Sequence, residues 1–392
     1  MKREKLYFCI KFNHMIKRIL QESIEQHFFK GKIILVIGPR QVGKTTLLQT
    51  IYDEFAEQKF WYNADDADVR ELFRNPSKAK LKPIFANKKL IIIDEAQRLE
   101  NAGLTLKIMI DNYKDVQIIA TGSSAFELND KLKESLTGRK FEYYLFPIST
   151  EELISHTSYF EENRIIEQRL LYGFYPEVIN HPGQENLILR SISDSVLYKD
   201  LFALEAVKKP YLLENILKAL ALQVGSEVSY NEVAQIVGAD KETVERYIYL
   251  LEQSFVIFRL QALSRNVRNE LKRSRKIYFY DNGIRNILIN NFSPLALRND
   301  KGALWENYLV SEKMKWNHYH HYYCNRYFCR TTQQQEIDYL EEQNGTLHAY
   351  EFKYADNKRA RLPITFIKAY PDHTFKMISK ENYIDFVSGE NH

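Results

Sequence analysis

One loop constrains this chain more than any other segment. It has the pattern G-x-x-x-x-G-K-T and consists of Gly38, Pro39, Arg40, Gln41, Val42, Gly43, Lys44 and Thr45. An aliphatic run, 33–37, precedes it, and a helical pattern follows it. Glycines let successive backbone N–H groups turn toward one anion, and the start of a helix adds a favourable dipole. The pattern therefore predicts a strand, a phosphate-binding loop and a helix in an α/β nucleotide-binding domain.

Three side chains at the end of this loop and just after it indicate what it binds. Lys44 supplies a positive charge to the β- and γ-phosphates, and Thr45 offers a hydroxyl to the magnesium ion that bridges them. Thr46 is the next hydroxyl along the chain. The expected cofactors are therefore ATP and Mg²⁺.

Two carboxylates follow a second aliphatic strand. The run 90–93 is entirely apolar and leads into Asp94 and Glu95. Parallel strands present their carboxyl ends to the ligand, so Asp94 is expected to hold magnesium and Glu95 to activate the attacking water. A strand ending in acids means little alone. Together with the phosphate loop, the pair predicts ATP hydrolysis, which makes this chain an expected ATPase.

Two further positions are candidates with an open alternative. The strand 116–120 ends in Thr121, Gly122, Ser123 and Ser124. Ser123 or Thr121 is expected to contact the γ-phosphate or the attacking water, unless the segment is only a turn of small residues. Arg139 is a candidate arginine finger for a neighbouring subunit, and the alternative is an ordinary surface arginine.

Length and composition indicate a modular soluble protein. The chain has 392 residues, which favours two or three domains, and it is 45% hydrophobic and 27% charged. Its net charge of +4 leaves the partner open. Three cysteines and the absence of any apolar run near 20 residues predict a cytoplasmic protein without a membrane span. The start is open between Met1 and Met15.

Changes in patterning divide the chain into four expected parts. These are an ATPase domain at 15–150, a helical lid or linker at 151–210, a winged helix-turn-helix at 211–290 and a small α/β domain at 291–392. In the third part, Ser229 and Asp240 are expected to begin two helices, and Gly238 to end the first. Strands are expected at 319–328, 337–340 and 348–354.

Several segments together resemble a family of bacterial and archaeal AAA-type ATPases with a nuclease-like C-terminal domain. The resemblance spans nearly the whole chain and rests on the loop 38–46 and on segments 93–97, 121–124, 136–139, 172–176 and 351–353. It implies an AAA-type parallel-sheet core, a winged helix and a restriction-endonuclease-like α/β domain. The residues before Met15 depart from the usual start of such chains.

DNA is one expected partner, on electrostatic grounds. The expected recognition helix, 241–253, exposes Lys241, Glu242, Glu245 and Arg246, and its two glutamates leave protein interaction equally open. A basic run follows, made of Arg265, Arg268, Lys272, Arg273, Arg275 and Lys276. Such a run neutralises phosphates without reading sequence, or it is a solvated loop.

Four C-terminal residues follow the order of a PD-(D/E)xK nuclease core: Glu306, Asp338, Glu351 and Lys353. Strand alternation places Glu351 and Lys353 on one face. Asp338 follows Ile337 instead of the motif's proline, which favours a binding role over an active nuclease. The spacing of Cys324, Cys329, His318, His320 and His321 argues against zinc, and the nearby tyrosines are expected to pack between domains.

The expected function is an ATPase whose cycle moves the middle and C-terminal parts on DNA, in a homo-oligomer. The alternatives are an ATP-dependent nuclease and an ATP-gated switch that captures a protein partner in defence or signalling.

Overall fold

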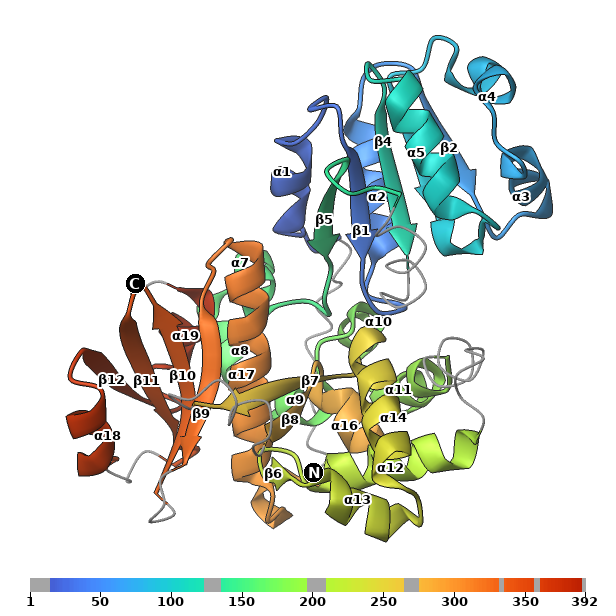
Figure 1. The fold of residues 1–392 in the computed structure, drawn as a ribbon. Coiled ribbons are helices and arrows are strands. Elements are labelled where there is room, and N and C mark those ends of the chain that lie inside the picture. The colour runs from blue at the N-terminus through green and yellow to red at the C-terminus, as the bar shows by residue number, and fades with distance from the viewer. Residues whose placement is uncertain are drawn as a thin grey trace, which may run out of the picture.

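The computed structural model describes residues 15–122, 135–195, 209–263, 275–330, 335–355 and 360–389. The first part is a five-stranded, fully parallel sheet (Figure 1). Its strand order is β2-β3-β4-β1-β5. The strands are β1 (Ile33–Ile37), β2 (Lys59–Asn63), β3 (Leu90–Asp94), β4 (Gln117–Gly122) and β5 (Lys140–Tyr144). The predicted parallel-sheet α/β fold is confirmed.

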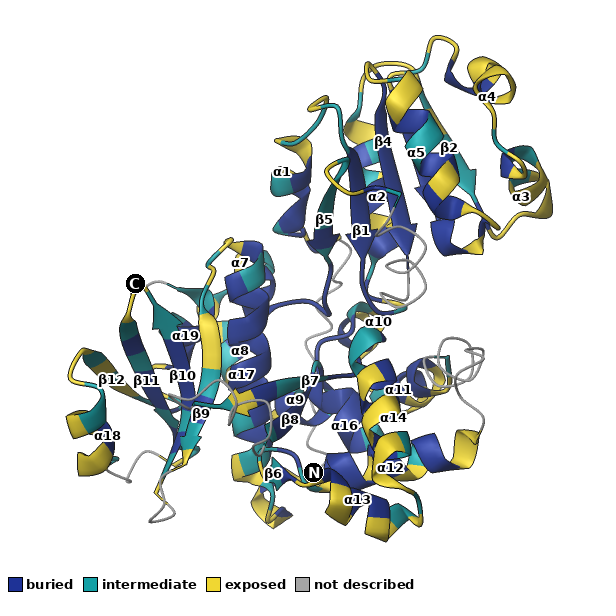
Figure 2. Ribbon diagram, viewed as in Figure 1, coloured by how far each residue is buried: buried dark blue, intermediate teal, exposed yellow. Residues whose placement is uncertain are grey.

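The centre of this sheet is apolar because helices cover both faces. Strands β1, β3 and β4 are buried at every residue, and Figure 2 shows β1 and β4 dark blue along their length. Continuous aliphatic runs are typical of such doubly covered strands. The surrounding helices are α1 (Leu20–Glu25), α2 (Lys44–Glu54), α3 (Ala67–Phe73), α4 (Lys78–Phe85) and α5 (Ala102–Asn112), with the short turn η1 (Ala96–Arg98). Because β4 lies between β1 and β3, the ends of all three strands meet at one edge.

A helical part follows β5. It consists of α7 (Thr150–His156), α8 (Tyr159–Arg164), α9 (Ile166–Tyr172), α10 (Pro176–Asn180) and α11 (Glu185–Asp194). Ser149 begins α7 with a capping box: its hydroxyl accepts from the Glu152 backbone N–H, and the Glu152 carboxylate accepts from the Ser149 N–H.

The next elements have the order expected of a helix-turn-helix followed by a hairpin. They are α12 (Pro210–Leu222), β6 (Glu227–Val228), α13 (Tyr230–Val237), α14 (Lys241–Gln253), β7 (Ile257–Ala262) and β8 (Arg275–Phe279). The three predicted cap residues are confirmed. The Ser229 and Asp240 side chains accept the expected backbone N–H groups, and Gly238 ends α13 with φ 69°. Strand β8 pairs with both β7 and β6.

The remaining strands extend this hairpin. The elements are α16 (Asn282–Leu288), η3 (Leu295–Leu297), α17 (Lys301–Tyr319), β9 (Asn325–Arg330), β10 (Glu336–Gln343), β11 (Thr346–Phe352), α18 (Ile364–Ala369), β12 (His373–Ile378) and α19 (Tyr383–Ser388). One seven-stranded sheet has the order β12-β11-β10-β9-β7-β8-β6. Strand β7 pairs with β9 in parallel. The sheet therefore runs across the expected boundary at 290 without a break.

One expected strand is wrong in part. The tyrosine-rich segment 319–328 was expected to be extended, but α17 continues through Tyr319 and β9 begins only at Asn325. Helix α17 is buried along most of its length, because it packs between the second sheet and the surrounding helices α9, α16 and α19 (Figures 1 and 2). This packing outweighs the strand preference of the aromatic residues.

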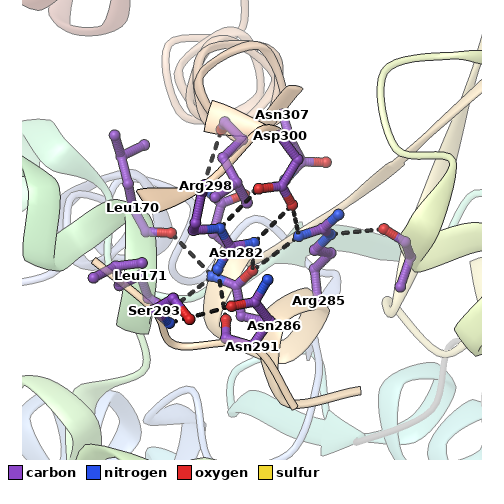
Figure 3. A network of polar contacts seen from close by, with 12 residues as sticks. Leu170, Leu171, Asn282, Arg285, Asn286, Asn291, Ser293, Arg298, Asp300 and Asn307 are labelled. Atoms are coloured by element: carbon purple, nitrogen blue, oxygen red, sulfur yellow. Dashed lines mark hydrogen bonds and ion pairs between the residues drawn. The ribbon is translucent and has the colours of Figure 1, made fainter. Parts of the chain in front are cut away.

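A buried polar network joins α9, α16 and the start of α17 (Figure 3). The Asn286 amide donates to the carbonyls of Leu170 and Leu171, at 3.2 and 2.8 Å. The guanidinium groups of Arg285 and Arg298 both bind the Asp300 carboxylate, at 2.6 and 2.7 Å. Such satisfied networks fix the mutual orientation of the elements that carry them.

Within the described ranges, no helix combines the length and the apolar character that crossing a membrane requires.

Candidate nucleotide-binding site

The phosphate loop connects β1 to α2 and depends on glycine geometry. Gly43 has φ 93° and Gln41 has φ 60°. A Cβ atom at Gly38 would lie 2.0 Å from the carbonyl oxygen of Leu145, which is closer than any side chain tolerates. The loop is therefore pressed against the segment that leaves β5, and Gly38 permits that approach.

Lys44 begins α2 and folds back over its own loop. Its ammonium donates to the carbonyl oxygens of Gly38 and Pro39, at 2.9 and 2.7 Å, and the side chain is buried. This places a positive charge inside the loop, beside the N-terminus of an eleven-residue helix. An anion entering the loop would meet both.

Asp94 is the centre of a hydrogen-bonded cluster. Its carboxylate accepts a hydrogen bond from the Thr45 hydroxyl at 2.9 Å and another from the Thr121 hydroxyl. The Glu95 backbone N–H donates to the same Thr121 oxygen at 2.8 Å. Of the two candidate sensor residues, Thr121 thus lies beside Asp94 and Glu95, while Ser123 is outside the described residues. Thr45 and Asp94 bring two oxygen donors together, which suits Mg²⁺.

Glu95 is held in an unusual backbone conformation. Its φ is 53°, in the left-handed region that non-glycine residues rarely adopt. The Gln97 amide donates a hydrogen bond to the Glu95 carboxylate. Strained backbone of this kind clusters at functional sites. Gln97 therefore positions the candidate base, a role that the sequence did not suggest.

A cavity of about 560 Å³ opens in front of the loop. One wall contains Arg40, Gln41, Gly43, Lys44, Thr45, Thr46 and Glu95. The other wall comes from the helical part, which contributes Glu177, Asn180, His181 and Ser195. In Figure 1, α10 lies directly below the ends of β1 and α2. The only sequence signal for this wall is the motif 172–176, whose Pro176 starts α10.

Arg18 fastens the back of the loop to the rest of the molecule. Its buried guanidinium donates to the carbonyl oxygens of Val42 and Phe146, each at 2.7 Å. It also donates to the Glu152 carboxylate at 3.0 Å and to the Tyr319 hydroxyl at 3.4 Å. Sequence reasoning missed Arg18, because nothing near it in the chain marks its four distant partners.

Arg139 does not reach the phosphate loop of its own chain. Its backbone carbonyl accepts from the Ile33 N–H at 2.9 Å, at the amino end of β1. The loop follows the opposite end of that strand. The Arg139 side chain is half-exposed and pairs with Asp111 at 2.7 Å. A role as an arginine finger therefore applies only to a neighbouring subunit and stays a prediction.

The four predicted nuclease residues converge, together with an unpredicted lysine. The Lys276 ammonium pairs with Glu306 at 2.8 Å and with Glu336, and the Lys353 ammonium pairs with Glu351. The Asp338 carboxylate accepts the Phe352 N–H at 2.7 Å. Burial raises the pKa of Glu306 to about 7; the charge of Asp338 adds to the rise, and Lys276 opposes it.

This cluster does not form a metal site in the structure. Across the described ranges, no three His, Cys, Asp or Glu side chains are arranged to hold a metal ion. A buried ammonium group instead neutralises the carboxylates. In this arrangement, ion pairs with Lys276 and Lys353 balance the charges of Glu306, Glu336 and Glu351.

Only two residues of the expected basic run, Arg275 and Lys276, lie among the described residues. Arg265, Arg268, Lys272 and Arg273 lie outside the described residues. The Arg275 guanidinium lies 4.3 Å from the centre of the Tyr230 ring. The prediction is wrong for Lys276, whose side chain is only 1% exposed and is held in ion pairs, so it is not part of a phosphate-binding surface.

Comparison with known families supports the nucleotide site. Residues 30–154 match the family model described as an AAA domain. Residues 163–295 and 301–387 match two families described as domains of unknown function, DUF8612 and DUF4143. The AAA-domain match covers the parallel sheet and the phosphate loop, so this part is similar to an AAA domain. No nuclease description accompanies the C-terminal match.

Similar chains occur in bacteria and archaea. An uncharacterised protein of Haemophilus influenzae is 24% identical over 279 residues, covering 64% of this chain and 68% of its own. One of Mycobacterium tuberculosis is 26% identical over 341 residues, covering 86% and 74%. One of Methanocaldococcus jannaschii is 23% identical over 319 residues, covering 75% and 69%.

Two solved structures show more distant similarity. A Walker-type ATPase of Pyrococcus abyssi has a TM-score of 0.47 and 17% identity, over 70% of this chain and 96% of its own. A signal-transduction ATPase with numerous domains from Pyrococcus horikoshii has a TM-score of 0.33 and 14% identity, over 78% and 46%. Both scores are below 0.5.

Proposed function

We propose that this chain binds ATP with Mg²⁺ in the loop 38–45 and hydrolyses it with Glu95 as the group that activates water. The observation that carries the proposal is the contact between Thr45 and Asp94, at 2.9 Å, beside the Lys44 ammonium and the Glu95 carboxylate. This arrangement combines a phosphate cradle, two oxygen donors for a cation and a base.

Each residue has a separate task in the proposed reaction. The backbone N–H groups of the loop and the Lys44 ammonium bind the β- and γ-phosphates, which requires Lys44 to exchange its two carbonyl partners for phosphate oxygens. Thr45 and Asp94 would hold Mg²⁺, and the ion would supply positive charge to the phosphates. Thr121 fixes the orientation of Asp94, and Gln97 that of Glu95, so that Glu95 accepts a proton from the attacking water.

The proposed cycle reaches the rest of the molecule by two routes. Helix α10 supplies the second wall of the cavity, so nucleotide binding bears directly on the helical part. Arg18 connects the loop to Phe146 and to Tyr319 at the end of α17, which packs against the seven-stranded sheet. A change at the phosphates therefore alters contacts made by both of the later parts.

DNA is the partner we propose for this movement. The order of α12, α13, α14 and the β7–β8 hairpin supports a winged-helix assignment, and Lys241 and Arg246 lie exposed on α14. Glu242 and Glu245 are exposed on the same helix, which keeps an ATP-gated switch for a protein partner as the competing assignment. Assembly into a homo-oligomer, with Arg139 acting on a neighbour, belongs to the same proposal.

Steady-state ATP hydrolysis with and without single- and double-stranded DNA, at low salt, separates these two assignments. Stimulation by DNA that disappears in Glu95→Gln supports the DNA-coupled ATPase. Lys241→Ala/Arg246→Ala is expected to reduce the stimulation without changing the basal rate. A rate of ATP hydrolysis that neither single- nor double-stranded DNA changes favours the protein-partner switch.

A second candidate activity is phosphodiester cleavage by the C-terminal cluster, favoured by the convergence of Glu306, Asp338, Glu351 and Lys353. The Lys276 ion pairs and the lack of a metal grouping among the described residues place it second. The test is DNA cleavage with Mg²⁺ or Mn²⁺: activity lost in both Asp338→Asn and Glu351→Gln supports a nuclease, and no cleavage by the wild type removes it.

A further inference from the structure

A second cavity, of about 600 Å³, lies where the parts of the molecule meet. Its walls come from the end of β5 and the segment after it, from the residues that flank the β7–β8 hairpin, and from the end of α17. The start of β9, the turn before it and the end of β10 complete the lining. No residue of this cavity belongs to the wall of the phosphate-loop cavity. It is therefore a separate site, not an extension of the first.

One side of this cavity, which we call the junction cavity, is built from aromatic rings. Phe146 and Tyr280 stack with centroids 5.4 Å apart and planes 13° from parallel. Tyr144 lies against Phe255 at 5.7 Å and against His318 at 5.3 Å. All five residues line the cavity. Clustered ring faces are the surface on which a flat heteroaromatic ligand stacks.

The floor of the junction cavity contains a hydrogen-bond acceptor without a donor. Asn317 is 5% exposed, and its amide nitrogen donates to the Glu341 carboxylate and to the Cys324 sulfur. Its amide oxygen is buried and has no hydrogen-bond partner among the described residues. The Glu341 Oε2 atom also has no hydrogen bond there, although it lies 4.0 Å from the Lys313 ammonium. Leaving buried acceptors unpaired is unfavourable. Because the Asn317 amide oxygen is closed off from the cavity, a ligand with N–H donors would satisfy it only after the Asn317 side chain turns toward the cavity.

The rim of the junction cavity offers a positive charge. Arg326 lies on β9 and is exposed, and within the described ranges its side chain makes no ion pair. Glu342, also on the rim, is engaged by the Asn325 amide at 3.4 Å. An arginine with a free guanidinium face binds phosphate oxygens with two parallel hydrogen bonds.

We propose that the junction cavity binds a nucleotide. The base stacks on the rings of the wall, and the phosphate binds the Arg326 guanidinium. The Asn317 side chain turns toward the ligand, so that its amide oxygen accepts hydrogen bonds from the N–H groups of the base. The volume suits a ligand of this size, since small-molecule pockets commonly span about 300–1,000 Å³. A free nucleoside monophosphate and the phosphorylated end of a DNA single strand share this chemistry. Nucleotide binding in the junction cavity does not require ATP hydrolysis at the phosphate loop.

The test uses the full chain carrying Lys44→Ala, so that the phosphate loop does not contribute binding. Titration calorimetry follows AMP, GMP, CMP and UMP, and then single-stranded DNA tetranucleotides with a 5′-phosphate. We expect saturable, one-to-one binding of at least one of these probes with a Kd below about 1 mM, an affinity typical of a weak specific site. Binding of monophosphates identifies a free nucleotide as the ligand, whereas binding of the tetranucleotides alone identifies a strand end.

Two variants on the same strand decide whether the binding belongs to the junction cavity. Arg326→Ala removes the rim charge from an exposed position and is expected to weaken binding at least tenfold. Arg330→Ala removes an arginine from the far end of β9, where it pairs with Glu227 at 2.8 Å, and is expected to change binding less than twofold. No binding of any probe, or equal weakening by the two variants, would overturn the proposal.

Discussion

The guanidinium of Arg18 donates a hydrogen bond to the carbonyl oxygen of Val42, in the phosphate loop, across 2.7 Å. The same guanidinium holds the carbonyl of Phe146, one residue beyond the segment on which Gly38 rests. One buried side chain thus links the loop to the start of the helical part. Tyr319 extends this link to α17, because its hydroxyl accepts from the Phe146 N–H at 3.1 Å.

We expect Arg18→Met to lower the free energy of unfolding by about 3 kcal/mol or more, since the fully buried Glu152 carboxylate loses its cation. Urea unfolding monitored by circular dichroism measures the change. Arg164→Met is the control, because that arginine pairs with Glu161 on the surface and is expected to matter by less than about 1 kcal/mol. Equal losses in the two variants would show that Arg18 does not have this structural role.

Gly38→Ala is expected to displace the phosphate loop. The added methyl group meets the Leu145 carbonyl at 2.0 Å, and this backbone atom cannot swing away as a side chain would. We expect ATP affinity to fall at least tenfold, measured with a fluorescent ATP analogue, together with a lower Tm. Gly302→Ala adds the same atom in helix α17 where no neighbour lies within 4 Å, so it should leave ATP affinity unchanged and should not lower the Tm. An unaltered Gly38→Ala protein would mean that the loop does not need this close approach.

We expect the buried His318 to make the protein less stable in mild acid. Burial lowers the pKa of its imidazole to about 4, and the nearby charges of His321 and Arg326 act in the same direction. In the unfolded chain the His318 imidazole becomes protonated below about pH 6.5, whereas in the folded chain it stays neutral down to about pH 4. Between these two pH values, protonation therefore favours the unfolded state. The free energy of unfolding should fall by about 3 kcal/mol across this window because of His318.

His318→Gln is the matched variant for this prediction. Its amide oxygen replaces the imidazole nitrogen that accepts from the Tyr144 N–H at 3.1 Å, but it does not titrate. Urea unfolding at pH 7 and pH 4.5 compares the two proteins. We expect the variant to lose less stability than the wild type between these pH values, and parallel losses would show that His318 is not the group responsible.

Local sequence predicted the phosphate loop because its chemistry is local. Gly43, Lys44 and Thr45 are consecutive, and Asp94 and Glu95 end an apolar strand. The spacing in the sequence is therefore enough to predict how these residues are arranged. Capping residues such as Ser229 and Asp240 were equally readable, since each cap acts on a backbone group three residues away.

Contacts between distant segments were not predictable in the same way. Arg18 and Tyr319 are 301 residues apart and meet only after folding. The pairing of β7 with β9 joins two parts of the chain that sequence patterning had separated. It was not predictable, because a ladder as short as the one at Gln261 and Ala262 has no sequence signature. In the sequence, Lys276 is one of a run of basic residues. Its buried ion pairs with Glu306 and Glu336 form only when distant segments come together in the fold.

The most direct test of the proposed ATPase measures ATP binding and ATP hydrolysis in parallel for three variants. We predict that Lys44→Ala loses both, that Glu95→Gln binds ATP as the wild type does but hydrolyses it at least a hundredfold more slowly, and that Glu100→Gln is unchanged. Glu100 is a suitable control because it is exposed and pairs only with Arg74 among the described residues. Hydrolysis that persists at the wild-type rate in Lys44→Ala would contradict the account.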